Sequence, residues 1–174
     1  MSAGAVYRER PLIAGEVCSA LWTVRFAAAT GDWLVLPDGC VDLVLDDQGT
    51  AVIAGPATRP NALAYPAGAQ AVGLRLPPGA APAVLRLSAA ELIDMTVPVA
   101  DLGLAPHQVT AVGRAQELLG KGQSDAAARV LSGVLAQAGE QDPVVRYAAG
   151  LLRENPTLGI GVVAERAGSR RVSC

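Results

Sequence analysis

The sequence predicts an α+β protein, with an N-terminal antiparallel β-barrel or sandwich followed by a helical C-terminal part. Two observations lead to this class. Short apolar runs alternate with turn residues in the N-terminal half, and glycine and proline are dense between positions 37 and 82. Positions 109–152, in contrast, contain almost no proline and repeat apolar residues at helical spacing. Hydrophobic residues make up 51% of the chain, which is ample for a folded core.

The β part is expected to be a meander of short strands joined by tight turns. In the turn Pro37-Asp38-Gly39, Pro presets φ, Asp caps the local backbone and Gly accepts a positive φ. A second turn, at 46–49, has the same character. Strands are therefore predicted at 17–26, 33–36, 40–45, 50–54, 62–65 and 69–76.

The strand at 40–45 has two unlike faces. Side chains alternate across a strand, so one face is purely aliphatic and the other is mixed. We expect the aliphatic face to pack as ordinary core and the mixed face to line a ligand cavity, because Cys and Asp side by side suit a cavity better than an apolar core. The aliphatic face carries Val41, Leu43 and Leu45, and the mixed face carries Cys40, Asp42 and Val44.

Helices are predicted over most of the second half. Ser88 and Glu91 form the sequence pattern of a capping box and predict a helix at 88–95. Asp142 followed by Pro143 is a strong N-terminal signal for another helix. The full set is 80–87, 88–95, 107–119, 124–138, 142–155 and 160–167, the last ended by Gly168, with a hydrophobically anchored loop at 97–104.

Composition excludes several classes of protein. The net charge of −2 is not that of a stand-alone nucleic-acid binder, which normally carries a basic surface. No apolar run is long enough for a transmembrane helix, and the N-terminus has no signal-peptide core. The odd, widely spaced cysteines Cys18, Cys40 and Cys174 predict neither a disulfide framework nor a zinc site, so a reducing cytoplasm is the expected compartment.

Metal chemistry is also disfavoured. His107 is the only histidine, and a metal-dependent enzyme built on a β-barrel usually needs several histidines with a carboxylate. We interpret His107 as a residue at a helix start. The chain is therefore expected to need no metal or cofactor and not to be an enzyme.

Six residues of the β part are candidates for a ligand site. Arg75 lies in an apolar run, so it must either pair with a carboxylate or receive an anionic ligand. Asp42 is expected to pair with an arginine, either Arg75 or Arg59. Cys40 is either a sensing thiol or a small core residue. Aromatic residues are only 3% of the chain, so Trp22, Trp33 and Tyr65 either line a pocket or fill the core.

Two sets of segments resemble a known family. Positions 34–44 read LVLPDGCVDLV, 55–60 read GPATRP and 72–80 read VGLRLPPGA. In order and spacing they resemble, over about residues 5–105, the N-terminal domain found in a branch of AraC-type transcription regulators. This resemblance implies a cupin-like β-barrel followed by helices, serving effector sensing and dimerisation.

The C-terminal segments resemble the opening of the AraC-type DNA-binding domain. Positions 142–146 read DPVVR, and after Pro156 positions 160–171 read IGVVAERAGSRR. They are similar to that domain's first long helix and the first helix and turn of its first helix-turn-helix. In the family a recognition helix follows at once, whereas this chain ends at Cys174 and lacks the usual apolar residue between the turn glycine and the serine.

The resemblance implies a division of labour. Residues 1–140 would be an effector-binding and dimerisation domain, with the barrel at about 5–80 and helices at about 80–140, and 141–174 would begin the DNA-binding domain. The helices from 107 to 138 are expected to form a homodimer surface, because two apolar-faced helices need cover. Arg170 and Arg171 would contact DNA only in a full-length regulator. The alternative is a free-standing ligand-binding or antagonist protein that does not bind DNA.

Overall fold

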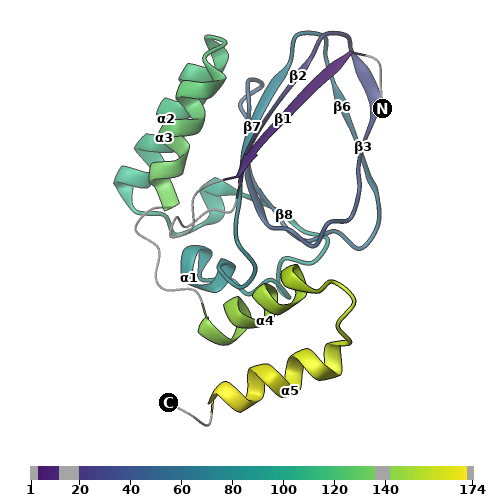
Figure 1. Ribbon diagram of the computed structural model, residues 1–174. Coiled ribbons are helices and arrows are strands. Elements are labelled where there is room, and N and C mark those ends of the chain that lie inside the picture. Colours follow the sequence, from purple (N-terminus) through teal and green to yellow (C-terminus); the bar gives the residue numbers. More distant parts are fainter. Residues whose placement is uncertain (1–3, 12–19, 136–141, 172–174) are drawn as a thin grey trace.

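The computed structural model describes residues 4–11, 20–135 and 142–171, and shows an N-terminal sheet region followed by helices (Figure 1). The predicted α+β class is therefore confirmed. Six strands form one antiparallel sheet in the order β1-β2-β7-β4-β5-β8, and β3 pairs with β6 in a second sheet. The strands are β1 (Ala5–Pro11), β2 (Ala20–Phe26), β3 (Thr30–Val35), β4 (Asp42–Asp46), β5 (Ala51–Ala54), β6 (Asn61–Tyr65), β7 (Gln70–Arg75) and β8 (Thr96–Pro98).

The helices follow the strands or connect the last of them. The short helix α1 comes after β7, a 3-10 turn η1 comes after β8, and four longer helices complete the described chain (Figure 1). Their bounds are α1 (Ala81–Leu85), η1 (Val99–Asp101), α2 (Pro106–Gly120), α3 (Ser124–Leu135), α4 (Pro143–Glu154) and α5 (Ile160–Arg171).

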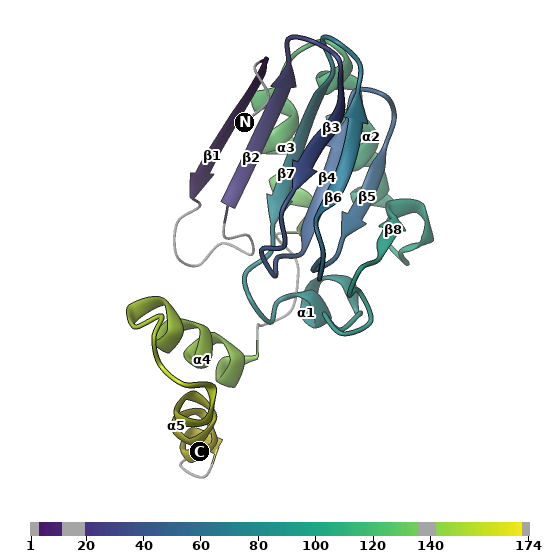
Figure 2. The same ribbon diagram turned by 90° about the vertical axis from the view of Figure 1, so that its right-hand side faces the viewer.

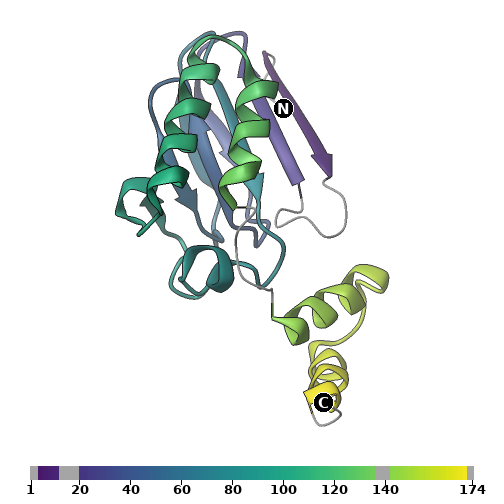
Figure 3. The ribbon, with the colours of Figure 1, turned by 90° about the vertical axis from the view of Figure 1, so that its left-hand side faces the viewer.

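The sheets do not close into a barrel. The β3–β6 pair lies opposite one face of the six-stranded sheet, in an arrangement compatible with a sandwich (Figure 2). Helices α2 and α3 cover the other face of the six-stranded sheet (Figure 3). We call the face toward β3–β6 the inner face and the face toward the helices the outer face.

The main core lies between the outer face and the helices. Leu43 and Leu45 of β4, with neighbouring Val41, are buried there against α2 and α3. The prediction that this aliphatic face packs as core is confirmed. The same cluster includes Leu21, Ile53, Val72 and Leu74 from the other strands and Val112, Ala115, Leu119, Ala127, Ala128 and Leu131 from the helices.

A second, smaller cluster lies between the two sheets. Phe26 is its buried centre: the Tyr65 ring stacks on it at 4.5 Å between centroids, and Trp33 meets it edge-on at 5.2 Å. Trp22 packs against the same cluster and stacks on Tyr7. Of the two Trp, three Tyr and one Phe in the chain, all but Tyr147 therefore lie on the facing surfaces of the two sheets.

Strand prediction missed both edges of the large sheet. β1 and β8 were not predicted, although the buried Val99 after β8 is the hydrophobic anchor expected in that segment. Both edge strands depend on one neighbour: among the described strands, β1 pairs only with β2, and β8 only with β5. Their pairing is therefore a tertiary effect that local propensity does not reveal.

The helix predicted at 88–95 is wrong. The capping box does form, because the Ser88 backbone N–H donates to Glu91 Oε2 at 2.8 Å and the Glu91 N–H donates to Ser88 Oγ at 3.3 Å. The segment nevertheless remains a series of turns. Asp94 takes a left-handed φ of 56° and accepts hydrogen bonds from the backbone N–H and hydroxyl of Thr58, which stops a helix from continuing.

The C-terminal pair confirms one prediction and corrects another. Asp142 caps α4 by accepting from the N–H groups of Val144 and Val145, and Pro143 is the first helical residue, as predicted. The turn predicted at Gly168 is not formed, because α5 continues through it to Arg171. A glycine inside a helix costs only about 1 kcal/mol, which the rest of the helix can offset.

The sheet covers the apolar faces of helices α2 and α3. Their buried side chains pack against the outer face, with α3 on β7 and α2 on β4. The argument that these apolar faces need a second subunit therefore no longer applies, and a homodimer surface on these helices stays a prediction. α2 starts at Pro106 with His107 exposed in its first turn, as predicted.

Some predictions fall outside the described residues. These are the first residues of the strand predicted at 17–26 with Cys18, the end of the helix predicted at 124–138, the proposed domain boundary near 140, and Cys174. Among the described helices, none is long and apolar enough to cross a membrane.

The close approach of Trp22 to Gly73 gives a stability prediction. A Cβ at Gly73 would lie 2.1 Å from the Trp22 ring, so Gly73→Ala must push the indole out of its place. We expect a loss of about 1–3 kcal/mol in the free energy of unfolding, the usual cost of overpacking. Urea unfolding followed by tryptophan fluorescence measures it.

Gly113→Ala is the matched control. A Cβ at Gly113 meets nothing within 4 Å, and the position is exposed in α2. Alanine there should stabilise by about 0.5–1 kcal/mol, because it is the better helix former. Equal effects of the two substitutions would contradict the packing of Trp22 on Gly73.

Candidate functional site

Sheet register brings a charged pair onto the inner face. β7 lies between β2 and β4, and its last residue, Arg75, stands directly opposite Asp42 of β4. Residues in register point to the same side of a sheet, so both side chains lie on the inner face. Gly73 and Trp22 form the next pair along the strands, and Glu9 of β1 stands opposite Trp22.

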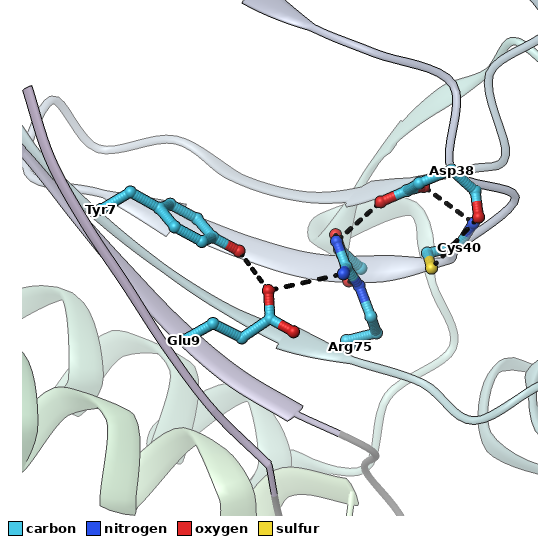
Figure 4. A network of polar contacts seen from close by, with 6 residues as sticks. Tyr7, Glu9, Asp38, Cys40 and Arg75 are labelled. Carbon is cyan, nitrogen blue, oxygen red and sulfur yellow. Dashed lines mark hydrogen bonds and ion pairs between the residues drawn. The ribbon is translucent and has the colours of Figure 1, made fainter. Parts of the chain in front are cut away.

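Arg75 is the centre of a network of polar contacts (Figure 4). Its Nε and Nη2 each reach one oxygen of Asp42 at 3.2 Å, which makes that pair bidentate. Nη2 also donates to Asp38 Oδ2 at 2.8 Å, and Nη1 lies 3.5 Å from Glu9 Oε2. The Tyr7 hydroxyl donates to the same Glu9 oxygen at 2.5 Å. One guanidinium thus joins β1, β4 and the β3–β4 connection to β7.

The three carboxylates differ in exposure. The Asp42 side chain is 15% exposed, whereas those of Glu9 and Asp38 are 37% and 45% exposed. Because a buried ion needs its partner far more than an exposed one does, Asp42 is the structural partner of Arg75. The predicted pairing of Arg75 with a carboxylate is confirmed, whereas the charge of Arg59 acts to lower the pKa of Asp94.

Burial and charge pairing have opposite effects on the pKa of Asp42 and on that of Arg75. Burial raises the pKa of Asp42, and the hydrogen bonds and charge of Arg75 counter it only in part. Burial disfavours the charged form of Arg75, but the Asp42 hydrogen bonds and charge, with Cys40 and Asp38, raise its pKa. Arg75 therefore stays a cation at any physiological pH.

Cys40 lies in the β3–β4 connection, beside the network. Its backbone N–H donates to Asp38 Oδ1 at 2.9 Å, so Asp38 is the turn residue that the sequence predicts. The other oxygen of Asp38 accepts from Arg75. The thiol donates to the Asp38 carbonyl oxygen at 3.5 Å. Burial raises the pKa of the Cys40 thiol to about 11, with the Arg75 charge acting against it. A raised thiol pKa is the opposite of what a sensing thiol needs.

Trp22 covers the middle of the inner face. Its ring crosses β7 where Gly73 has no side chain, so the indole reaches from β2 toward β4. The indole N–H is buried and has no hydrogen-bond acceptor among the described residues. It faces Asp42 and acts to lower the pKa of that carboxyl, although the two groups fall outside strict hydrogen-bond geometry.

The structure brings four of the six predicted ligand-site residues together and leaves two apart. Arg75, Asp42, Cys40 and Trp22 form or border the network. Trp33 and Tyr65 belong instead to the apolar cluster around Phe26. Arg170 and Arg171 occupy the last turn of α5, and the structure does not describe their side chains.

Sequence reasoning missed Tyr7 and Glu9. Both lie on β1, the edge strand that was not predicted. A signal was present: in the segment Ala-Val-Tyr-Arg-Glu-Arg-Pro, Tyr7 and Glu9 alternate with Arg8 and Arg10, as in a strand with two different faces.

Two hollows lie away from this network. One, of about 280 Å³, is lined by Phe26 and residues 28–32. The other, of about 390 Å³, lies between α1, η1 and the start of α2. Within the residues that the structure describes, no group of three or more His, Cys, Asp or Glu side chains could hold a metal ion.

Comparison with known proteins adds one match. Residues 15–98 match the model of a family described as a domain of unknown function, DUF6597. The matched segment runs from before β2 to the end of β8, so it includes Trp22, Asp38, Asp42 and Arg75 but not β1 or the helices α2–α5. Comparisons with curated proteins and with solved structures found no match.

Removal of the Arg75 charge should be costly and pH-dependent. In Arg75→Gln, Asp42 remains buried without its bidentate partner, and we expect a loss of about 2–4 kcal/mol in the free energy of unfolding. The pKa of Asp42 lies above its unfolded value already and rises further without Arg75, so the folded variant holds the proton more tightly. The loss should therefore be small near pH 4 and grow as the pH rises to 8.

Asp38→Asn and Glu9→Gln are the controls for that measurement. Each removes an exposed partner of Arg75 and should cost at most about 1 kcal/mol. Urea unfolding at several pH values compares the three variants. A pH-independent loss in Arg75→Gln would show that packing, not charge pairing, explains its effect.

Cys40 should react slowly with alkylating reagents. Its pKa is raised from 9.0 to about 11, so the thiolate fraction at pH 7.5 should fall by about 100-fold, at about tenfold for each pKa unit. Iodoacetamide labelling of a Cys18→Ser, Cys174→Ser variant, followed by mass spectrometry, measures the rate. The same variant in urea should regain the ordinary rate, whereas fast labelling of the folded protein at pH 7.5 would support the sensing-thiol hypothesis.

Proposed function

We propose that this chain is the effector-sensing part of an AraC-type bacterial transcription regulator, acting in the cytoplasm, with its small-molecule site around Arg75. The observation that carries this proposal is the charged network on the inner face of the sheet. A purely structural core would be aliphatic there, as it is on the outer face. The segments that resemble AraC-type regulators supply Asp38, Asp42 and Arg75 of that network.

β7 offers a route from the site to the helices. It carries Arg75 on its inner face, while Val72 and Leu74 are buried on its outer face against the α2–α3 layer. A ligand that changes the contacts of Arg75 therefore acts on a strand that α3 packs against. Sensing requires only that the ligand bind two arrangements of this strand and its helices with different affinity.

The α4–α5 pair is proposed to belong to the DNA-binding half. None of the α4 side chains is buried, and the apolar Ile160 and Val162 of α5 are exposed. Such apolar surface suits two helices that form part of a larger helical unit. In a full-length regulator Arg170 and Arg171 would meet DNA phosphates. With a net charge of −2, the chain alone is not expected to bind DNA specifically.

One observation favours the alternative, a free-standing ligand-binding or antagonist protein. α5 continues through Gly168, where a helix-turn-helix would turn. Such a protein would sequester a ligand or pair with complete relatives, and it would use the same site at Arg75. Neither function requires catalysis, a metal or a cofactor.

A reporter assay separates the two functions. The full chain is fused to a DNA-binding domain that represses a reporter gene only as a dimer. We expect repression that changes when small-molecule fractions of a bacterial extract are supplied, and loss of that response in Arg75→Gln but not in Gly113→Ala. Extract-dependent thermal stabilisation without any effect on the reporter would favour the free-standing alternative. Sequence-specific binding of the unfused chain to DNA at physiological salt would contradict both readings.

A further inference from the structure

A hollow away from the Arg75 network lies between α1, η1 and the start of α2. Its volume of about 390 Å³ falls within the range of about 300–1,000 Å³ that is typical of small-molecule pockets. None of the residues that line it takes part in the contacts of Arg75. A binding site in this hollow would therefore be separate from the one proposed above and goes beyond the proposed function.

Aliphatic side chains from two segments line the hollow. Leu85 of α1 is buried in the main core, and the other four are half-buried and pack against that core. These side chains are closely packed from behind and offer apolar surface to a ligand in the hollow. The four are Val84 and Leu87, in and just after α1, and Leu102 and Leu104, between η1 and α2.

Two side chains of opposite charge line the same hollow without pairing. Arg86 follows α1 and Asp101 ends η1, and both residues are exposed. Within the described part of the chain, neither side chain makes an ion pair or a hydrogen bond. Arg75 and Asp42 neutralise each other, whereas the charges of Arg86 and Asp101 remain available to a ligand.

Arg86 also stands at a backbone position that favours glycine. It takes a left-handed φ of 58°, and its N–H donates to the Pro82 carbonyl oxygen at 3.1 Å to close α1. Glycine adopts this conformation at the end of a helix with less strain than any residue that has a Cβ. Local folding therefore does not account for an arginine here, and a role for its side chain in the hollow does.

We propose that the hollow binds a small zwitterion with an aliphatic body, namely an aliphatic amino acid. Arg86 would bind its carboxylate and Asp101 its ammonium group through charge-assisted hydrogen bonds. The aliphatic side chain would lie against Leu102 and Leu104, where burial of apolar surface adds affinity. His107 lines the hollow as well and offers a further hydrogen-bonding group. A simple anion or cation would use only one of the two charges.

A series of compounds related to leucine tests the proposal. Leucine carries both charges at neutral pH, 4-methylpentanoate lacks the ammonium group, and 3-methylbutylamine lacks the carboxylate. Glycine keeps both charges but has no aliphatic side chain. Isothermal titration calorimetry of the full chain measures the four affinities. We expect saturable binding of leucine, with each of the other compounds weaker by at least about tenfold, which corresponds to about 1.4 kcal/mol.

Two variants assign each charge of the ligand to its partner. Arg86→Gly suits the left-handed backbone, so the protein should fold at least as stably, yet it should bind leucine and 4-methylpentanoate at least about tenfold more weakly. Asp101→Asn should weaken the binding of leucine and 3-methylbutylamine by a similar factor. Neither variant should change the affinity for the compound that lacks the matching charge. Arg129→Gln, a charge change at an exposed position of α3, is the control and should leave all affinities unchanged.

Three results would overturn the proposal: no saturable binding of leucine to the folded protein, an analogue that binds as tightly as leucine, or an unchanged affinity for leucine in Arg86→Gly or Asp101→Asn. Asp38→Asn separates this site from the one at Arg75, because it removes a contact of Arg75 and should leave leucine binding unchanged. Weaker leucine binding in Asp38→Asn would place leucine at the Arg75 network and contradict the assignment to the hollow. A reporter without any response, in contrast, would contradict the proposed function and not this site.

Discussion

Arg75 is a cation on a central strand of the large sheet, and its need for counter-charges organises the inner face. β7 is hydrogen-bonded to β2 on one side and β4 on the other. This pairing fixes the side chain of its last residue on the inner face. Asp42 stands in register with it and provides the bidentate partner. Asp38 and Glu9 then bring the β3–β4 connection and the edge strand β1 to the same guanidinium. A single charge thereby joins segments far apart in the sequence.

The two faces of β7 are packed in different ways. Its outer side chains lie in the aliphatic core beneath α2 and α3, where close packing resists displacement. On its inner face, Ala71 is buried beside Phe26, Gly73 leaves room for the Trp22 ring, and Arg75 makes the polar contacts. The strand is therefore held rigidly on one side and by exchangeable polar contacts on the other. That asymmetry is what a strand would need to report a bound molecule to the helices.

Patterns within a few residues of the sequence predicted those features of the structure that depend on neighbouring residues. Alternation placed Leu43 and Leu45 in the core and Asp42 on the opposite face, and the Asp142-Pro143 pair started α4. The need of an apolar-flanked arginine for a carboxylate predicted the pairing of Arg75 with Asp42. The capping box at Ser88 formed its hydrogen bonds but no helix, because Asp94 is tied to Thr58 across the fold.

By itself, the sequence determined the α+β class, most strand positions, the helical second half and the residues that form the centre of the candidate site. These follow from periodicity, turn chemistry and the cost of burying a charge, which act over a few residues. Only the tertiary structure decided that the sheets stay open, that β1 brings Tyr7 and Glu9 to Arg75, and that α2 and α3 are covered by the sheet. Those outcomes depend on which strands and faces meet, and long-range pairing is not encoded in any one segment.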